Sequence, residues 1–375
     1  MADMHIQQVV LREIQLPLIA PFITSFESFT HRRIILVQVF DDHGMTGWGE
    51  CVATEEPLYN HEFIDGAWLL LRDYLIPQLF NMDMESPAAI ADKFAPIRGN
   101  RMARAAIEAA CWDLYAKREQ KPLWQILGGT RTEIDCGVSI GIQPSLSEMV
   151  EKIERELADG YRRIKLKIKP GLDIQIAGTA RERFPDTPIM LDANSAYTLA
   201  DKGVLKELDR FDLMMIEQPL ADDDLIDHAT LQKQIKTPIC LDESIHSVEF
   251  ARQAHEIDAC KIINIKLGRV GGHTEARRIH DYCLGKSIPV WCGGMLETGI
   301  GRAHNIALST LQGFCLPGDV SASKRYWKQD IIEPEVTIDQ NGRIKAQVGI
   351  GIGYEVNLKL IDKLTLRKEV VKAQF

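Results

Sequence analysis

The spacing of apolar and polar positions divides this chain into three regions. Near the N-terminus, short alternating runs bounded by turn-forming residues predict an antiparallel sheet with strands over 5–18, 32–42 and 45–52. Apolar residues then recur at helical spacing over 61–79, and an alanine-rich helix is predicted over 101–119. From residue 134, short apolar runs alternate with helical stretches, and after about residue 325 this alternation ends in strands and turns.

The alternating region predicts a parallel βα repeat. Its strands are expected at 136–142, 163–169, 188–192, 213–217, 238–242, 261–266, 288–294 and 313–319. A strand, a helix and two loops need roughly 25 to 30 residues, which matches the spacing of these runs. Eight strands in about 185 residues make a compact closed barrel, so we expect one unit to be irregular. The fold class is therefore α/β, a (β/α) barrel accompanied by a smaller α+β domain.

Composition narrows the classes of partner. The chain has 375 residues, of which 45% are hydrophobic and 26% charged, as in an ordinary globular protein. Its net charge of -9 argues against nucleic acid and against an anionic membrane as a partner. No apolar run is as long as a membrane span, and the first residues show no secretory pattern. Eight cysteines without a CxxC pair predict a cytoplasmic protein without a disulfide framework or a zinc cluster.

Three acids carry the strongest chemical signal. Asp192, Glu217 and Asp242 stand 25 residues apart, and each ends a predicted strand. Residues at the carboxyl ends of barrel strands converge on one site, where carboxylates repel one another unless a cation lies between them. Three oxygen ligands with water and substrate suit octahedral Mg²⁺, with Mn²⁺ as a close substitute. Any one of these acids could instead cap a helix, but three in register are harder to explain that way.

Lysines flank these acids. The run over 163–169 alternates strictly, so Lys165 and Lys167 share one face about 7 Å apart. Like charges near a metal cation repel, which lowers the pKa of at least one lysine and allows it to act as a base near neutral pH. Lys266 ends the predicted sixth strand, across the barrel, and could address the opposite face of the same substrate carbon. The competing interpretation is that Lys165 and Lys167 lie on a solvated strand face and that Lys266 is a surface lysine at a strand end.

Six motifs together resemble one family. They are KLKIKPG, LDANSAYT, MIEQPL, CLDES, NIKLGRVGG and WCGGMLETGIGRAHN. They resemble the enolase superfamily, in particular its muconate-cycloisomerase-like subgroup and the group of o-succinylbenzoate synthases and N-acylamino acid racemases. The resemblance covers essentially the whole chain. It implies a modified TIM barrel over 131–325, with an α+β capping domain formed by residues 1–130 and by the returning tail, 326–375.

The resemblance also implies a role for each site residue. Lys167 is the base that removes an α-proton, while Lys266 stabilises the enediolate as a cation or acts as a second acid and base. Asp192, Glu217 and Asp242 bind Mg²⁺, as the superfamily combines a Lys or His base with this metal. The implied substrate contacts are Ser139, Lys165, Asn194, Gly293, Gly294, Met295 and Tyr59. Capping loops 21–26 and 54–59 are expected to close over the succinyl end of the substrate.

Two activities fit this resemblance. One is Mg²⁺-dependent dehydration of 2-succinyl-6-hydroxy-2,4-cyclohexadiene-1-carboxylate in menaquinone biosynthesis, and the other is racemisation of N-succinylamino acids. Some members of the group that the chain resembles perform both. The expected partners are a small-molecule carboxylate substrate and further copies of the chain in a homo-oligomer. A dipeptide epimerase fits less well, because it typically has a DxD pair on strand eight, where this chain has GDVS around Asp319. A silent scaffold and a metal-assisted hydrolase remain as alternatives from other classes.

Overall fold

A curved parallel sheet forms the centre of the computed structural model, which describes residues 4–80 and 82–373. Its seven strands lie in the order β11-β10-β9-β8-β7-β6-β5. They are β5 (Val138–Ile140), β6 (Ile164–Lys167), β7 (Ile189–Asp192), β8 (Ile216–Glu217), β9 (Ile239–Leu241), β10 (Ile262–Ile265) and β11 (Val290–Cys292). The first seven predicted barrel strands are therefore confirmed, although each is shorter than the apolar run that predicts it.

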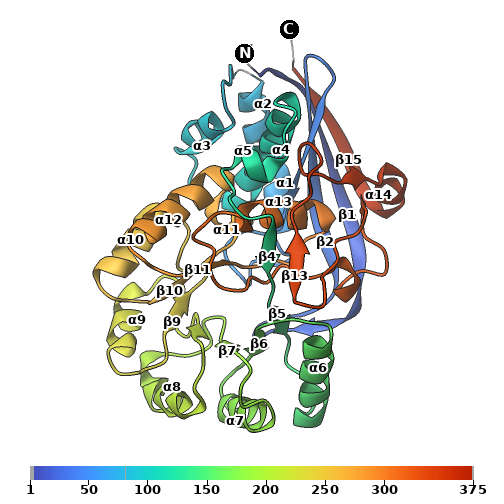
Figure 1. The fold of residues 1–375 in the computed structure, drawn as a ribbon. Helices are drawn as coiled ribbons and strands as arrows, with labels where there is room; N and C mark the ends of the chain where they lie inside the picture. The colour runs from blue at the N-terminus through green and yellow to red at the C-terminus, as the bar shows by residue number, and fades with distance from the viewer. Residues whose placement is uncertain (1–3, 81, 374–375) are drawn as a thin grey trace.

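Helices cover the outer face of this sheet (Figure 1). They are α6 (Leu146–Ala158), α7 (Asp173–Arg183), α8 (Lys202–Glu207), α9 (Leu225–Gln232), α10 (Val248–Glu256), α12 (His273–Gly285) and α13 (Gly299–Ser309). The short helix α11 (Leu267–Val270) follows β10 and packs on the N-terminal region instead. Apolar residues of strands and helices pack between the two layers in one large core. A second, smaller cluster fills the inside of the barrel and consists of Met190, Met215, Cys240, Ile262 and Trp291. This inner cluster forms the floor beneath the charged residues at the strand ends.

The prediction of an eighth strand over 313–319 is wrong. In the structure this segment makes only isolated bridges, from Phe314 to Val290 of β11 and from Gly318 to Cys136 just before β5. It still occupies the eighth position, since Gly137 N donates to Gly318 O at 2.8 Å. Pro317 lies within the segment and has no N–H to donate, so a regular ladder cannot run through it. The expectation of one irregular unit is confirmed here.

The N-terminal region forms a separate antiparallel sheet in the order β15-β1-β2-β3. Its strands are β1 (Ile6–Ile23), β2 (Ser28–Asp41), β3 (Thr46–Cys51) and β15 (Thr365–Lys372). Helix α4 (Arg101–Arg118) packs directly on β3, because a Cβ added at Gly47 or Gly49 would meet an α4 carbonyl oxygen at 2.1 Å. The other helices of this region are α1 (Ile64–Leu70), α2 (Ile76–Leu79), α3 (Ala88–Phe94) and α5 (Leu123–Ile126). A π-helical turn over Leu71–Leu75 joins α1 to α2 just before Pro77.

The tail returns to the first sheet, as predicted. After the short strands β12 (Ile332–Glu333), β13 (Arg343–Lys345) and β14 (Glu355–Val356), helix α14 (Leu358–Leu364) leads into β15. Strand β15 pairs antiparallel with β1, which places the first and the last strand of the described chain side by side (Figure 1). Strand β13 instead pairs with β4 (Glu133–Asp135), at the start of the barrel region. The exact limits at residues 130 and 325 stay predictions, and residues 1–3 and 374–375 of the predicted regions lie outside the described residues.

Two further structural facts bear on the sequence predictions. All eight cysteines are free, and all but Cys315 are buried. Within residues 4–80 and 82–373, no helix combines the length and the apolar composition that a bilayer span requires.

Candidate active site

Strand register brings the predicted charged residues together at one end of the barrel. Lys167 of β6 lies beside Asp192 of β7, which lies beside Glu217 of β8. Because side chains alternate along a strand, Lys165 and Lys167 share the inner face while Ile164 and Leu166 join the outer core. The strand ends therefore place a layer of charges directly above the inner apolar cluster.

The two lysines of β6 experience opposite electrostatic environments. Lys167 Nζ donates to Asp192 Oδ2 at 2.6 Å and to Asn194 Oδ1 at 2.5 Å. Burial lowers the pKa of Lys167, and the positive charge of Lys165 lowers it further. The ammonium of Lys165 instead lies within 3.1 Å of three carboxylates, those of Asp319, Glu217 and Asp192. Burial opposes the charged form of Lys165, but these carboxylates outweigh it and raise its pKa.

Lys266 approaches from the end of β10. Its Nζ lies 2.7 Å from Asp242 Oδ2 and donates to the Tyr59 hydroxyl at 3.3 Å. The same ammonium lies 4.6 Å from the centroid of the Tyr59 ring, a cation–π arrangement. Burial disfavours the ammonium, yet the neighbouring Tyr59 and Glu243 raise the pKa of Lys266 overall. Lys266 is thus held as a cation, whereas Lys167 is the more easily deprotonated lysine.

Two small cavities, each of about 60 Å³, lie at this end of the barrel and share Lys167, Lys266 and Gly294 in their walls. The first lies under the capping loops and is also lined by Phe22, Thr24, Phe26, Tyr59, Asn194 and Met295. The second is also lined by Ser139, Lys165 and Asp319. Residues of segments 21–26 and 54–59 therefore line the barrel mouth, although 21–23 still belong to β1; closure over a substrate stays a prediction.

Gly293 lines neither cavity. A Cβ at this position would come within 2.4 Å of Asn264 Oδ1 and 2.8 Å of Lys266 Cε. The absence of a side chain at Gly293 therefore makes room for two neighbouring side chains, whereas the sequence suggested close approach of a ligand.

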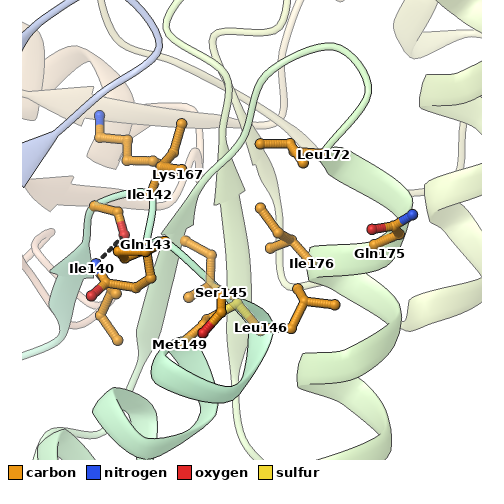
Figure 2. Close-up of a pocket in the computed structure, with 13 residues that line it drawn as sticks. Ile140, Ile142, Gln143, Ser145, Leu146, Met149, Lys167, Leu172, Gln175 and Ile176 are labelled. Carbon is orange, nitrogen blue, oxygen red and sulfur yellow. Dashed lines mark hydrogen bonds between the residues drawn. The ribbon is translucent and has the colours of Figure 1, made fainter.

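A larger pocket of about 220 Å³ lies on the other side of β6. Its wall comes mainly from apolar residues of the loop after β5 and of helices α6 and α7. Figure 2 shows the ammonium of Lys167 pointing away from Leu172 and Ile176, which line this pocket.

Three polar residues of the site were not identified from the sequence. Asn264 Nδ2 donates to Glu217 Oε1 at 2.7 Å, and Gln218 Oε1 accepts from Asp242 N at 3.0 Å. Asp319 bridges Lys165 and Arg163, whose Nη1 lies 2.7 Å from Asp319 Oδ1. Asn264 had a usable signal, since it precedes Lys266 by two positions and therefore shares its strand face. Gln218 has an unusual backbone, with φ of 39°, but nothing in the sequence indicates this.

The three predicted metal ligands are almost completely buried at adjacent strand ends, with exposures of 1% for Asp192 and 0% for Glu217 and Asp242. In the described part of the chain, no three His, Cys, Asp or Glu side chains are spaced as ligands of one metal ion. The negative charges of Asp192, Glu217 and Asp242 are instead balanced by Lys165 and Lys266 and by Arg269, which pairs with Asp242.

The donor set nevertheless fits a hard divalent cation. Three carboxylates from neighbouring strands supply the oxygen ligands that Mg²⁺ prefers. Burial and the nearby charge of Asp192 raise the pKa of Glu217, so a further positive charge would be favourable there. Adjacent Glu243 is buried too, its Oε2 has no hydrogen-bond partner, and burial raises its pKa to about 7.

Sequence profiles of two known domains match most of the chain. Residues 6–128 match the N-terminal domain of mandelate racemase and muconate lactonizing enzyme, and residues 148–360 match the enolase C-terminal domain-like family. The chain belongs to the enolase superfamily. Its predicted fold class, a modified TIM barrel with a capping domain, is that of the superfamily structures it resembles.

Individual superfamily members resemble the chain over nearly its full length. An o-succinylbenzoate synthase from Geobacillus kaustophilus is 55% identical over 361 residues, which cover 96% of each chain. An N-succinylamino acid racemase from Thermus thermophilus is 47% identical and covers 99% of this chain and 100% of its own. A crystal structure of an enolase superfamily member from Listeria innocua superposes with a TM-score of 0.95 at 44% identity, covering 98% of this chain and 99% of its own.

In this enolase superfamily protein, Glu50 of the capping sheet holds the loop that carries Gly294 and Met295. Its carboxylate accepts from Thr298 N at 3.0 Å, from Thr298 Oγ1 at 2.5 Å and from Gly301 N at 2.9 Å. These groups form the first turn of α13 directly after the loop. Burial, with a smaller contribution from the charge of Glu297, raises the pKa of Glu50 to about 8.

We expect this carboxyl group to make stability depend on pH. Because the pKa of Glu50 is higher in the folded state than its ordinary value of 4.5, the folded protein binds the extra proton between these two values. Stability should fall as pH rises from 5 to 8, by up to about 1.4 kcal/mol per pH unit. Urea unfolding at several pH values should show this slope in the wild type and in Glu151→Gln, an exposed control, but a flatter slope in Glu50→Gln. An unchanged slope in Glu50→Gln would assign the effect to another group.

Proposed function

We propose that this protein is an o-succinylbenzoate synthase, which removes water from 2-succinyl-6-hydroxy-2,4-cyclohexadiene-1-carboxylate. The observation that carries this proposal is the contrast between two buried lysines that line the same cavities. The pKa of Lys167 is lowered and that of Lys266 is raised, so the first is suited to accept a proton and the second to remain a cation. The similarity to curated synthases at up to 55% identity supports the same reaction.

The reaction can be followed through the residues of this chain. Neutral Lys167 takes the proton from the carbon that carries the substrate carboxylate, and Asn194 Oδ1 orients its Nζ. Lys266 faces the negative charge that develops on the substrate as the C–H bond breaks. Protonated Lys167 then returns the proton to the departing hydroxyl group on the same side, so that the C–O bond breaks, water leaves and the ring becomes aromatic.

A metal ion completes this proposal. Mg²⁺, with Mn²⁺ as a substitute, would be held by Asp192, Glu217 and Asp242 and would supply Lewis-acid stabilisation of the substrate carboxylate. The capping residues Phe22, Phe26 and Tyr59 would cover the bound substrate and exclude water from the lysines.

The second candidate is an N-succinylamino acid racemase. Lys266 and Lys167 come from β10 and β6, on different sides of the barrel, as two bases working on opposite faces of one carbon require. A racemase needs Lys266 to lose its proton in one direction of the reaction, and its carboxylate and phenol surroundings oppose this. The synthase needs Lys266 only as a cation, and we therefore place dehydration first.

The two candidates are separated by measuring both activities on one preparation. With Mg²⁺ present, we expect dehydration, followed by the loss of ultraviolet absorbance of the cyclohexadiene, at a kcat/KM of about 10⁴ to 10⁸ M⁻¹s⁻¹. Racemisation is followed in D₂O by exchange of the α-proton of N-succinylamino acids. Dehydration far below this range in a folded, Mg²⁺-bound protein, with racemisation inside it, would transfer the assignment to the racemase.

A further inference from the structure

A cavity of about 450 Å³ lies between the capping domain and the barrel, apart from the lysine site. Its walls come from α3 and α4 of the cap and from the region of α10, α11 and α12 of the barrel. It shares no lining residue with the two cavities at the strand ends. Whatever it binds would therefore touch both domains without entering the proposed active site.

Two arginines in this cavity form no salt bridge with a described residue. Arg101 and Arg104 lie one turn apart on α4 and are both half-buried. Among the described residues, the Arg101 guanidinium makes no hydrogen bond and has no carboxylate within 4.0 Å. Arg104 donates through Nη1 to Phe94 O at 3.0 Å, but its Nε is buried without a partner. Burial lowers the pKa of both groups and outweighs the attraction of Glu62 and Glu275, and the charge of Arg101 lowers the pKa of Arg104 further.

The described acids that line the same cavity form no salt bridge with either arginine, although Glu275 attracts both from a greater distance. Glu108 accepts from Trp112 Nε1 at 3.0 Å and from the backbone N–H groups of His273 and Thr274 at 2.6 and 2.9 Å. Glu275 accepts from Val248 N at 2.7 Å and lies 3.4 Å from Arg278. The remaining lining acid, Glu249, is exposed.

Glu62 lies behind the first turn of α4 and is also occupied. It accepts from Arg101 N and Met102 N, both at 2.8 Å. The α4 amides are thus satisfied, while the Arg101 and Arg104 side chains remain available to a ligand.

We propose that this cavity binds the phosphate group of a small molecule through Arg101 and Arg104. Two guanidiniums that form no salt bridge with a described residue match the double charge of a phosphate, and their planar forks can donate in pairs to its oxygens. His246 from the barrel completes the polar wall, and Ile90, Phe94 and Ile97 offer apolar surface to the rest of the molecule.

A phosphate bound in this cavity would contact both the capping domain and the barrel. Arg101 and Arg104 belong to the capping domain, whereas His246 and Gly271 belong to the barrel. A bound phosphate would therefore cross-link the two domains, and because it binds only the folded protein it would raise the melting temperature.

Titration calorimetry and thermal melting at constant ionic strength test the proposal with two probes, inorganic phosphate and phenyl phosphate. We expect saturable binding of one probe molecule per chain and a rise in melting temperature. Affinity should be at least tenfold weaker in Arg101→Gln/Arg104→Gln and unchanged in Arg155→Gln, which removes an exposed arginine from α6. Tighter binding of phenyl phosphate would identify a phosphate ester as the natural source, and tighter binding of inorganic phosphate the free ion.

Three further variants keep the test decisive. Arg101→Lys keeps the positive charge and removes no side-chain hydrogen bond or salt bridge to a described residue, so it should weaken binding while leaving the melting temperature without phosphate unchanged. Lys167→Ala and Lys266→Ala should bind both probes as the wild type does. Equal affinity in the double arginine variant, or loss of binding in either lysine variant, would overturn the proposal and place the phosphate in the lysine site.

Discussion

Replacing Lys167 by alanine is expected to lower kcat for the proposed dehydration by about 10³- to 10⁴-fold, at the upper end of what a positioned general base contributes. Lys167 is the lysine of the site with a lowered pKa, and its Nζ is oriented by Asp192 and Asn194. Lys165 cannot replace it, because three carboxylates hold that ammonium in its charged form. Removing Lys167 therefore leaves the site without a neutral amine.

Lys169 provides a matched control on the same chain segment. It lies two positions after Lys167 but is exposed, so Lys169→Ala should keep nearly full turnover. Both variants should be assayed by ultraviolet absorbance, and exchange of the substrate α-proton in D₂O should be lost only in Lys167→Ala. Thermal melting must show that both variants are folded. If folded Lys167→Ala retains turnover within tenfold of the wild type, another group is the base.

The strand ends show how much of the site follows from local sequence. The alternation of Lys165 and Lys167 with Ile164 and Leu166 predicts an inward lysine face, because a strand has a period of two. The recurrence of an acid at the end of each run places Asp192 next to Glu217, as the register of β7 and β8 confirms. These features depend on a repeated unit that the hydrophobic pattern already contains. Nothing beyond the spacing is needed to bring them together.

Contacts between distant segments could not be predicted in this way. Tyr59 and Lys266 lie 207 positions apart, and only the docking of the cap on the barrel places the phenol on the ammonium. The position of Asp319 beside Lys165 could not be predicted either, because the segment that carries Asp319 contains Pro317 and follows no regular strand register. Gln218 reaches the backbone of Asp242 through a left-handed backbone conformation that its residue type does not favour.

Replacing Glu217 by glutamine is expected to weaken Mg²⁺ binding by about 100-fold or more and to lower turnover with it. Glu217 is the central acid of the three, and it is completely buried. Even residues that only support a metal ligand change metal affinity by about 10- to 100-fold, so the loss of a ligand charge should reach at least that range. The substitution keeps the shape of the side chain, and Asn264 Nδ2 can still donate to its oxygen.

The measurement must separate a metal ligand from a structural counter-ion, because Glu217 Oε2 also lies 3.0 Å from Lys165 Nζ. Titration calorimetry with Mg²⁺ alone gives the affinity without relying on activity, and Glu256→Gln, on the exposed face of α10, is the control. A purely structural role would lower the melting temperature of Glu217→Gln and leave its Mg²⁺ affinity unchanged. That outcome would remove Glu217 from the proposed metal site, whereas a folded variant with weakened Mg²⁺ binding would tie the buried acids at the strand ends to the metal.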